Sequence, residues 1–518
     1  MKFTSETLAL IKGLRKDVTT SGIATGTGLN FFYLEAQAKN IYPVFYPILA
    51  STPRVNPMFN GMKVGGLATN WKAIVGIDAG GYPAVSEGNR NSFLNVSERN
   101  YASTYKFLGK DIQTSFQAQQ TGLGFDDNVA LAQLSLLNAL LNDEERMILY
   151  GNSGPANVGG NGYALGLTPT PVIAQSNATG ANVTASAQNY VFCVALTPWG
   201  VQLAGSTGVK LPFLRSNADS SQDSINGGTG IISGVSNTIV TDASHKSITA
   251  TVTAVTGAAG YAWYLNQADN TKATAYFVGV TSTPTTIIMA TPSVANQKAN
   301  ATDTTGTSKD LTTDNSYNLL DFDGILTWHF GTALSSQPAY LADMGGAGFT
   351  SNGDGTIKEF EDCADYLWKN YKASVDKIYV GGSLIQSASR AVLTGSATTG
   401  AQRLYIERGA DGSVSGGQII RTYHWKYSTS GAPKDVEVVT HPWLPDGVVL
   451  FDITTNPYPA AGDAIPSVRR IVSLEDHFSI KWPYRKLQHE IGVYCFETMQ
   501  HYLPFCGGVI TGVANKVN

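Results

Sequence analysis

The sequence has few charged residues for its length. Only 14% of its 518 residues are charged, against roughly one quarter in a typical soluble protein. The 35 basic and 39 acidic residues give a formal net charge of −4, and no run of Lys and Arg is longer than a pair such as Arg469-Arg470. Proteins that hold nucleic acid by neutralising phosphates need a basic excess or basic clusters. Tight, direct binding of nucleic acid is therefore not expected.

Cysteines and long apolar runs are also scarce. The four cysteines, Cys193, Cys363, Cys495 and Cys506, show no CxxC spacing, so we expect buried, reduced thiols and no disulfide framework. The longest apolar run, Tyr190–Leu196, is too short to span a bilayer, and the first residues lack the apolar core of a signal peptide. These features predict a soluble protein that is made in a cytoplasm and has no membrane partner.

Templates for metal and nucleotide sites fail when they are compared with the sequence. The pair His489-Glu490 would need a second histidine at position 493 to form a zinc-protease helix, and that residue is Val493. The segment Gly228–Gly230 resembles part of a dinucleotide loop, but its third glycine is one residue late and no helix pattern follows. We interpret the histidines as packing or surface residues and the glycines as a turn.

Acidic motifs are equally weak. Asn352–Gly355 resembles the start of a calcium loop without its twelve-residue ligand pattern, so a turn is the better interpretation. Asp321 and Asp323 are paired only in sequence. We therefore predict no catalytic, cofactor-binding or metal-binding residues and no cofactor, and we do not expect an enzyme, although a hydrolase of unrecognised family remains an open alternative.

The sequence is rich in turn and aromatic residues, with 54 glycines and 24 tyrosines. Residues 1–60 combine a short amphipathic helix over Ser5–Lys16, a Thr/Gly stretch and an aromatic segment broken by prolines. Such a segment cannot bury its aromatic side chains alone. We expect an arm that lies across another surface.

Residues 65–108 have the pattern of a long two-stranded ribbon. Apolar residues alternate from Trp71 to Ile77 and again from Tyr101 to Phe107, on either side of a tip rich in Gly, Pro and Asn. An isolated ribbon is only marginally stable in water. Its apolar residues need a partner surface, in this chain or in a neighbouring molecule, and an ordinary sheet hairpin is the alternative.

The strongest helix pattern covers residues 126–150. Leu134, Leu137, Leu141 and Ile148 follow helical spacing, and Asp126 or Asp127 can cap the first turn. At 1.5 Å per residue this helix is roughly 36 Å long.

A change in composition marks a separate module after this helix. Residues 152–314 contain 13 charged residues, against 61 in the remaining 355. Short strand patterns at 190–196, 248–254, 261–265, 276–280 and 287–289 are separated by turns, as in a sandwich. The run Val255–Tyr264 resembles a fibronectin-like strand pair, and the module resembles an immunoglobulin-like or fibronectin type III-like domain.

The last third has a mixed α/β pattern. Thr356 and Glu359 have the spacing of a capping box, ahead of a helix with Ile357, Phe360, Ala364 and Leu367 on one face. Strands are predicted at 378–380, 436–439, 448–451, 478–482 and 491–496.

The order of these segments resembles the major capsid protein family of tailed bacteriophages. Thr440–Phe451 is similar to the family's proline-rich turn and apolar strand, and Glu490–Val513 is similar to its closing strands. The resemblance implies an α+β capsid fold with an inserted all-β immunoglobulin-like sandwich. Its implied parts are an N-terminal arm (1–60), an E-loop (61–110), a P-domain with a long spine helix (111–152), the insertion (165–315) and an A-domain with interleaved P-domain strands (316–518).

The resemblance also implies a function. The chain would assemble into hexamers and pentamers of an icosahedral phage head, a virion shell built in the bacterial host cytoplasm. Portal, scaffolding and decoration proteins would be further partners, and packaged double-stranded DNA would be held by confinement. An alternative is a virion decoration or adhesion protein that acts through the immunoglobulin-like domain, but the long helix and the large α/β portion argue against it.

Overall fold

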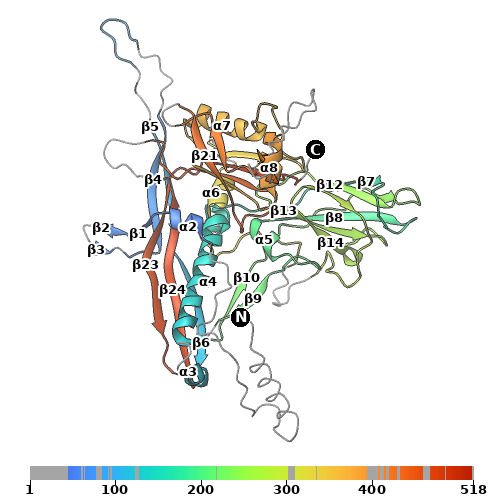
Figure 1. Cartoon of the computed structure of the whole chain (residues 1–518), viewed down its shortest axis with the longest axis horizontal. Coiled ribbons are helices and arrows are strands. Elements are labelled where there is room, and N and C mark those ends of the chain that lie inside the picture. Colours follow the sequence, from blue (N-terminus) through green and yellow to red (C-terminus); the bar gives the residue numbers. More distant parts are fainter. Residues whose placement is uncertain are drawn as a thin grey trace.

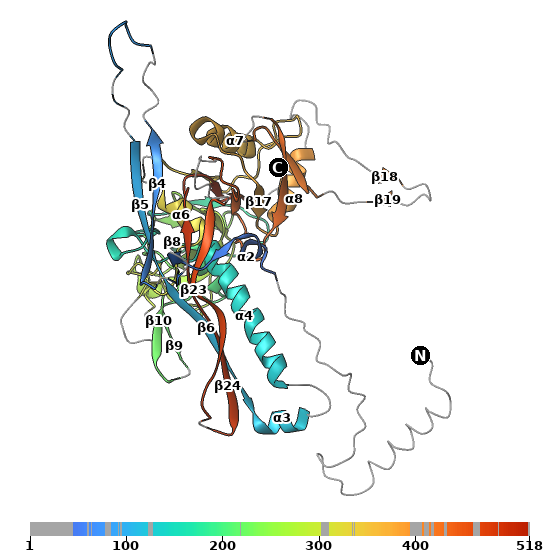
Figure 2. The same cartoon turned by 90° about the vertical axis from the view of Figure 1, so that its left-hand side faces the viewer.

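The structure is a computed structural model. The chain forms an elongated body with a ribbon that projects from it (Figures 1 and 2). The structure describes residues 45–515 except for gaps at 60–61, 64, 78–83, 92, 94–95, 123–127, 218, 302–309, 334, 336, 394–406, 409–413, 416–418, 429–431, 459–466 and 485. The predicted helix over Ser5–Lys16, and most of the predicted arm, lie outside the described residues.

A four-stranded sheet forms the long axis of the body. Its strands are β1 (Arg54–Val55), β23 (Arg469–Lys481), β24 (Gln488–His501) and β6 (Lys106–Ser115), in that spatial order. The predicted strand at 478–482 covers the last residues of β23 and extends one residue beyond it, and the predicted strand at 491–496 is the central part of β24. The sheet brings both ends of the sequence together, because β6 pairs with β24 from Ser115 opposite Gln488 to Lys106 opposite Glu497.

The predicted long helix is α4 (Asn128–Tyr150), which packs against one face of this sheet. Leu136 and Leu140 are buried against Val493 of β24. The predicted apolar face was wrong at Leu134, which is 56% exposed, whereas Leu137 packs against this cluster and Ile148 is buried. Leucines surround Leu134, so their spacing alone could not identify the side that meets the sheet. The predicted capping residues, Asp126 and Asp127, lie outside the described residues. The shorter helices α2 (Pro47–Ser51) and α3 (Phe116–Gly122) lie beside α4.

The predicted ribbon is formed by β4 (Ala68–Ile77) and β5 (Val96–Thr104), which pair antiparallel with Ala68 opposite Thr104. The ribbon is shorter than predicted at its second strand. Residues 106–108 belong to β6 in the long sheet, and Phe107 lies opposite Phe496 of β24. Alternation continues through this junction, so the sequence pattern did not mark the change of sheet.

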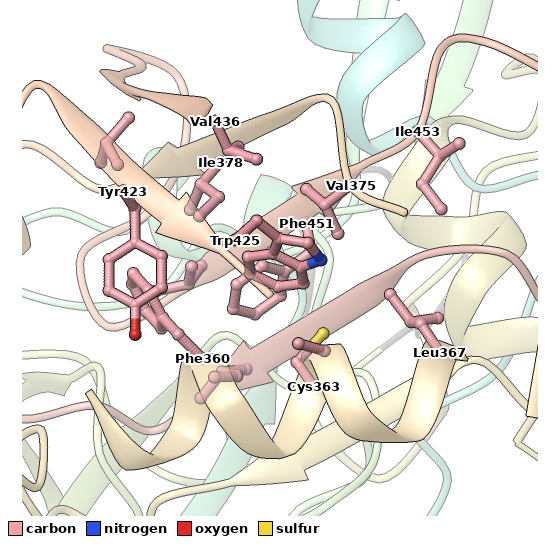
Figure 3. Close-up of a cluster of buried hydrophobic side chains, with 14 of the residues drawn as sticks. Phe360, Cys363, Leu367, Val375, Ile378, Tyr423, Trp425, Val436, Phe451 and Ile453 are labelled. Carbon is pink, nitrogen blue, oxygen red and sulfur yellow. The ribbon is translucent and has the colours of Figure 1, made fainter. Parts of the chain in front are cut away.

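A mixed six-stranded sheet forms the second lobe. Its spatial order is β16 (Tyr340–Asp343), β25 (Gly508–Thr511), β22 (Val449–Asp452), β17 (Lys377–Val380), β21 (Lys434–Thr440) and β20 (Thr422–Trp425). One face packs against α7 (Lys358–Tyr371) and α8 (Leu384–Leu393). In Figure 3, Phe360 and Leu367 of α7 point toward Trp425 and Phe451 of the sheet. The other face packs against the end of α4 and against α6 (Ile325–Gly331).

The start of α7 differs from the predicted capping box. The Thr356 hydroxyl donates to Asp354 at 2.6 Å, and the Glu359 carboxylate accepts the Thr350 backbone N–H at 3.0 Å. Both side chains therefore stabilise the preceding turn, and neither caps the helix. The apolar face is confirmed, since Ile357, Phe360, Ala364 and Leu367 are all buried.

A buried ion pair joins the two sheets. The Arg469 guanidinium of β23 binds Asp452 of β22 through both of its terminal nitrogens, one of them at 2.8 Å. Each side chain is 1% exposed. Replacing one partner of such a pair leaves a buried charge without its counter-ion, which is strongly destabilising.

Residues 165–315, the middle module, contain two facing sheets. One has the order β15 (Thr285–Ile288), β12 (Ser247–Thr251) and β7 (Val172–Ser176), and the other β11 (Ile239–Val240), β8 (Gln188–Leu196), β13 (Gly260–Asn266) and β14 (Tyr276–Thr281). Ile248 and Trp263 lie in the core between them. A second cluster, which includes Phe192 and Tyr264, covers the outer face of β8 and β13. Burial on both faces explains the continuous apolar run Tyr190–Leu196.

The chain leaves the body for the middle module and returns to it at one place. The Asn318 N–H donates to the Asn152 carbonyl at 2.9 Å, and the Gly324 N–H donates to the Gly151 carbonyl at 2.8 Å. The module also contacts the body through Gln202, which accepts from the Tyr150 hydroxyl at 2.6 Å and donates to the Trp443 carbonyl at 2.7 Å.

The remaining short elements are the paired strands β2 (Met58–Phe59) and β3 (Met62–Lys63), β9 (Phe213–Ser216) and β10 (Gln222–Ile225), and β18 (Glu407–Arg408) and β19 (Val414–Ser415), the helix α5 (Pro198–Leu203), and the 3-10 turns η1 (Ala156–Val158) and η2 (Lys272–Thr274). Within the described ranges, no helix is both long enough and apolar enough to cross a membrane.

Candidate functional site

The residues of the rejected sequence motifs have structural contacts. His489 lies on β24, where its Nε2 is 2.8 Å from Gln119 Oε1 and its ring packs edge-on against Phe116. Gly228 has φ +80° in a turn, and its N–H donates to the Asn315 carbonyl at 2.9 Å. A Cβ there would lie 2.5 Å from the Gly200 nitrogen, so close packing of two backbone segments requires this glycine.

The two aspartates have different surroundings. Asp323 is 2% exposed and accepts the Ser153 N–H at 2.9 Å, the Ser153 hydroxyl at 2.8 Å and the Asn161 N–H at 3.1 Å. Burial raises the pKa of its carboxyl. Burial also raises the pKa of Asp321 to about 7. Asp323 fixes the segment in which the chain leaves the body. The turn interpretation of Asn352–Gly355 is confirmed, with Gly353 and Gly355 at positive φ.

All four cysteines are buried and free, as expected from the sequence. Burial raises the pKa of each thiol, well above its usual value for Cys193 and Cys363 and to about 12 for Cys506.

Aromatic side chains anchor the base of the β4–β5 ribbon to the body. Trp71 stacks on Tyr101 with ring centroids 5.7 Å apart and contacts Trp328 and Tyr502 at 5.9 and 6.3 Å. The Trp71 indole N–H donates to the His501 carbonyl at 3.2 Å. Trp71 and Tyr101 are 8% and 7% exposed. Burial raises the pKa of the Tyr101 hydroxyl. The predicted need for a partner surface is met here within the chain.

Beyond the base, the side chains that the structure describes at the tip of the ribbon are exposed. Residues 84–91 are all exposed, and Phe93 is 96% exposed. Among the described residues, β4 and β5 pair with no third strand. Figures 1 and 2 both show the ribbon standing away from the two lobes. An exposed phenylalanine on a marginally stable ribbon is typical of an interaction site.

A second exposed aromatic surface covers the face of the long sheet opposite α4. We define the outer stripe as Phe107, Phe478, Trp482 and Tyr494. Its members are partly exposed, with Phe107 at 60% and Trp482 at 40%.

A glycine on β6 makes room for the outer stripe. The Tyr494 ring lies flat across β6, and a Cβ on Gly109 would lie 2.0 Å from that ring. The Tyr494 hydroxyl donates to Asp111 at 2.7 Å, which fixes the ring in this position. The aromatic surface is therefore held rigidly in place.

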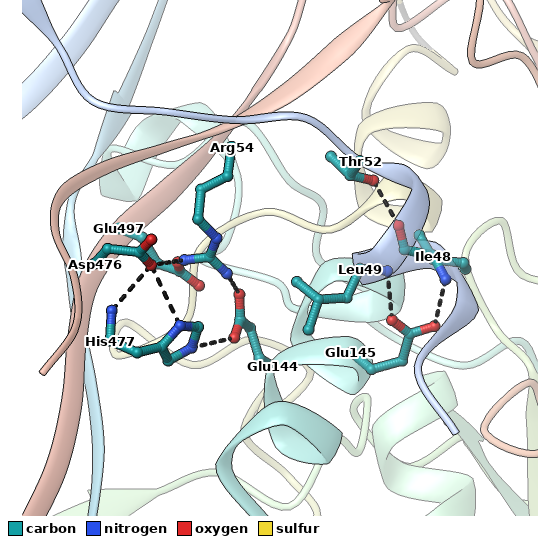
Figure 4. Close-up of polar contacts among 9 residues, drawn as sticks. All are labelled: Ile48, Leu49, Thr52, Arg54, Glu144, Glu145, Asp476, His477 and Glu497. Atoms are coloured by element: carbon teal, nitrogen blue, oxygen red, sulfur yellow. Dashed lines mark hydrogen bonds and ion pairs between the residues drawn. The ribbon is translucent and has the colours of Figure 1, made fainter. Parts of the chain in front are cut away.

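A buried carboxylate attaches α2 to the long helix. Glu145 of α4 accepts the Ile48 N–H at 2.9 Å and the Leu49 N–H at 2.7 Å, as Figure 4 shows. The same carboxylate lies 2.9 Å from His441 Nε2. The Trp443 N–H donates to His441 Nδ1 at 3.3 Å, so the proton of the imidazole is on Nε2 and points to Glu145. Both side chains are 0% exposed.

A charged node lies one residue away, between α4 and the long sheet (Figure 4). Arg54 of β1 binds Glu144, Glu497 at 2.6 Å and Asp476 at 2.9 Å. His477 Nε2 lies 2.9 Å from Glu144. Burial and the nearby Glu144 charge raise the pKa of Glu497 well above its usual value, although Arg54 opposes this effect. The node ties β1, α4, β23 and β24 together.

Two buried histidines lie where β24 meets α6. His329 Nδ1 donates to the Pro504 carbonyl at 2.8 Å, and the rings of His329 and His501 are 5.7 Å apart. Burial lowers the pKa of His329 to about 4 and that of His501 well below its usual value. Gly507 has φ +149°, and a Cβ there would lie 2.4 Å from the His329 ring.

The Glu145 contacts and the charged node were not predicted from the sequence. One signal was present for Glu145, because it follows Leu141 by four residues and precedes Ile148 by three, which places a carboxylate on an apolar helix face. The node had no such signal. Arg54 is 90 positions from Glu144 and 443 positions from Glu497 along the chain.

The sequence matches no protein-family model and no curated protein sequence. Solved structures that are similar to this chain include the capsid of cyanophage A-1(L), with a TM-score of 0.41 and 9% identity over 94% of this chain and 98% of that one. The capsid of the empty GTA particle gives 0.40 and 7% over 94% and 96%. An encapsulin complex from Synechococcus elongatus gives 0.33 and 8% over 93% and 94%.

One of these structures is a phage capsid, which is the class of protein that the sequence resembles.

Proposed function

We propose that this chain is the major capsid protein of a tailed phage, which assembles with copies of itself into the hexamers and pentamers of an icosahedral shell. The observation that carries the proposal is the β4–β5 ribbon, with Phe93 at 96% exposure. The outer part of the ribbon, which its own chain does not cover, adds no packing to a monomer. A second copy can cover it.

The outer stripe supports contacts between copies. The ribbon projects at one end of the molecule, whereas β23 and β24 extend to the other end (Figure 1). The exposed ribbon and the far end of the stripe therefore cannot meet within one chain. Contact between two different surfaces of neighbouring copies is heterologous and produces rings or open lattices. A closed shell requires heterologous contacts of this kind between neighbouring copies.

The same proposal gives a role to each part of the chain. In this proposal, residues 1–60 are the arm, and 61–110 are the E-loop, whose last residues continue into β6 of the long sheet. Residues 111–152 are the start of the P-domain with α4 as its spine, and 316–518 are the A-domain with interleaved P-domain strands. The shell would enclose double-stranded DNA by confinement, in keeping with the net charge of −4. Portal, scaffolding and decoration proteins are its further partners, and the virion, assembled in the bacterial cytoplasm, is its location. No catalytic step belongs to this role.

We also propose that the middle module is an immunoglobulin-like insertion. Its support is the pair of facing sheets of three and four strands, with Trp263 in the core between them. The Tyr261 hydroxyl accepts the Val255 N–H at 2.9 Å. Domains of this architecture share the sandwich without always sharing the strand connections.

The ribbon is tested by the substitution Phe93→Ser. Wild-type protein at high concentration should form shells or hexameric rings in negative-stain micrographs. The variant should keep the wild-type melting temperature, because an exposed side chain contributes little to subunit stability, and should lose the assemblies. The matched control is Val294→Ser, which changes a 77% exposed side chain on the middle module and should leave both properties unchanged.

Two results would contradict the proposal. One is assembly of the Phe93→Ser variant at wild-type yield. The other is a wild-type chain that stays a folded monomer at high concentration, and coating of bacterial cells by such monomers would favour the adhesion alternative.

A further inference from the structure

The charged node contains a set of side chains that is unusual for a purely structural ion pair. Glu144, His477 and Cys495 each offer one ligand atom, and these atoms all lie within 4.8 Å of one another. Glu144 and Cys495 are buried, and His477 is 20% exposed. A thiolate, an imidazole and a carboxylate are the ligands of zinc and similar transition metals, whereas calcium and magnesium take oxygen ligands.

The backbone of β23 is irregular where it supplies the histidine. The register between β23 and β24 shifts between Ser473 and Glu475 and again between Glu475 and Phe478. The shifts mark β-bulges, which re-aim side chains and occur often next to functional sites. Here the bulged segment carries His477 toward Glu144, at 2.9 Å between Nε2 and the carboxylate.

The other nitrogen of His477 has the contact that metal-binding histidines require. Its Nδ1 lies 3.2 Å from Asp476 Oδ1. Metal-ligating histidines commonly donate their second N–H to a carboxylate, which fixes the tautomer and the ring orientation. Without a metal, Nε2 donates to the Glu144 carboxylate. With a metal bound, Nδ1 would keep its proton and Nε2 would present its lone pair to the ion.

The neighbouring Glu497 supplies an independent observation. Glu497 lies two residues after Cys495 on β24, so both side chains are on the face that meets α4. Its side chain is 0% exposed, one oxygen binds Arg54, and the other, Oε1, has no hydrogen-bond partner among the described residues. A buried carboxylate oxygen without a donor is costly, and a bound cation would satisfy it.

Charge balance also favours a cation. Three carboxylates, those of Glu144, Asp476 and Glu497, surround one guanidinium and one imidazole. A divalent ion offsets this excess of acidic groups. Asp476, which is 52% exposed, and His477 border the solvent and give the ion a route into the cluster.

We propose that Glu144, His477 and Cys495 form a binding site for Zn²⁺ or a similar divalent transition metal, with Glu497 Oε1 as an adjacent donor. On binding, the Cys495 thiol and the Nε2–H group of His477 each lose a proton to solvent, and the sulfur coordinates as thiolate. The His477–Glu144 hydrogen bond is then replaced by one bond from Nε2 and one from the carboxylate to the metal. The ion joins α4, the bulge of β23 and β24, and so fixes the long helix to its sheet.

The test uses Co²⁺ as a spectroscopic substitute for zinc, with the full-length, unassembled chain. Wild type should bind one cobalt per chain and show a thiolate-to-cobalt charge-transfer band in the near ultraviolet. Cys495→Ala should lose the band, whereas the control Cys506→Ala, which removes another buried thiol, should keep it. Added Zn²⁺ should displace the cobalt and raise the melting temperature of wild type.

Two further variants keep the test decisive if Cys495→Ala does not fold. His477→Gln changes a partly exposed ligand and should lower cobalt affinity at least tenfold. Asp476→Asn keeps every ligand and should lower it roughly 10- to 100-fold through the orientation of His477. The proposal is refuted if wild type shows no stoichiometric cobalt and no band, or if folded Cys495→Ala keeps the band. These readouts do not depend on shell assembly.

Discussion

Replacing Glu145 by alanine should detach α2 from the long helix. The carboxylate receives three hydrogen bonds, from the Ile48 and Leu49 N–H groups and from His441. Hydrogen bonds to a charged group contribute about 1.5–3 kcal/mol each, and removal of the buried carboxylate itself relieves part of its desolvation cost. The net loss of stability should be close to that for removing one partner of a buried ion pair, about 3–5 kcal/mol. Ile48, which is fully buried, should become accessible.

Native-state hydrogen exchange measures this effect at the donors themselves, because it reports local opening segment by segment. A loss of about 3 kcal/mol lowers the protection of the Ile48 and Leu49 amides on the order of 100-fold. Glu145→Gln keeps one acceptor oxygen and should lose less. The control Asp143→Ala removes a 39% exposed carboxylate of the same helix and should change protection by less than about tenfold. Unchanged protection in Glu145→Ala would refute the assigned role.

Three more predictions concern the contacts between the lobes. Arg469→Met should destabilise the chain by about 3–5 kcal/mol, and adding Asp452→Asn should restore part of the melting temperature; equal melting of the single variant and wild type would contradict this. Because the pKa of His329 is lowered to about 4, its contribution to stability is full above the unfolded pKa of about 6.5 and is lost as the pH falls toward 4, by about 3 kcal/mol. Melting curves between pH 4 and 7 should therefore show a shallower decline for His329→Gln than for wild type, and parallel curves would exclude this role. Gly507→Ala should lower stability by about 1–3 kcal/mol through its clash with the His329 ring, measured by thermal melting, and a wild-type melting temperature would show that the ring can move aside.

The sequence predicted the elements whose side chains follow one period over many residues. The strands β8 and β13 and the apolar face of α7 were found because their buried faces extend along nearly the whole element, and α4 was found because its second half is buried in the same way. The interpretation of Thr356 and Glu359 failed for a local reason. Both side chains had a nearer partner in the preceding turn, and spacing alone does not choose between a turn and a cap.

Contacts between distant segments could not be predicted in this way. The outer face of the long sheet combines β6 with β23 and β24, which lie more than 350 positions later. The charged node likewise needs the sheet to be assembled before Arg54 meets Glu497. Hydrophobic periodicity reports which face of an element is buried, and not which element covers it. The cluster of Glu144, His477 and Cys495 therefore had no signature in the histidine and cysteine spacings.

The hydrogen bonds between Asn152 and Asn318, and between Gly151 and Gly324, close the body where the middle module begins and ends. The module therefore closes a loop between neighbouring positions of the body, and each doubling of a closed loop adds only about 0.6 kcal/mol of entropy cost. Its removal would expose the body residues that it covers, among them Tyr150 and Trp443 beside Gln202, and Gly447 beside Ser282. A different domain grafted at this junction would have to cover the same surface.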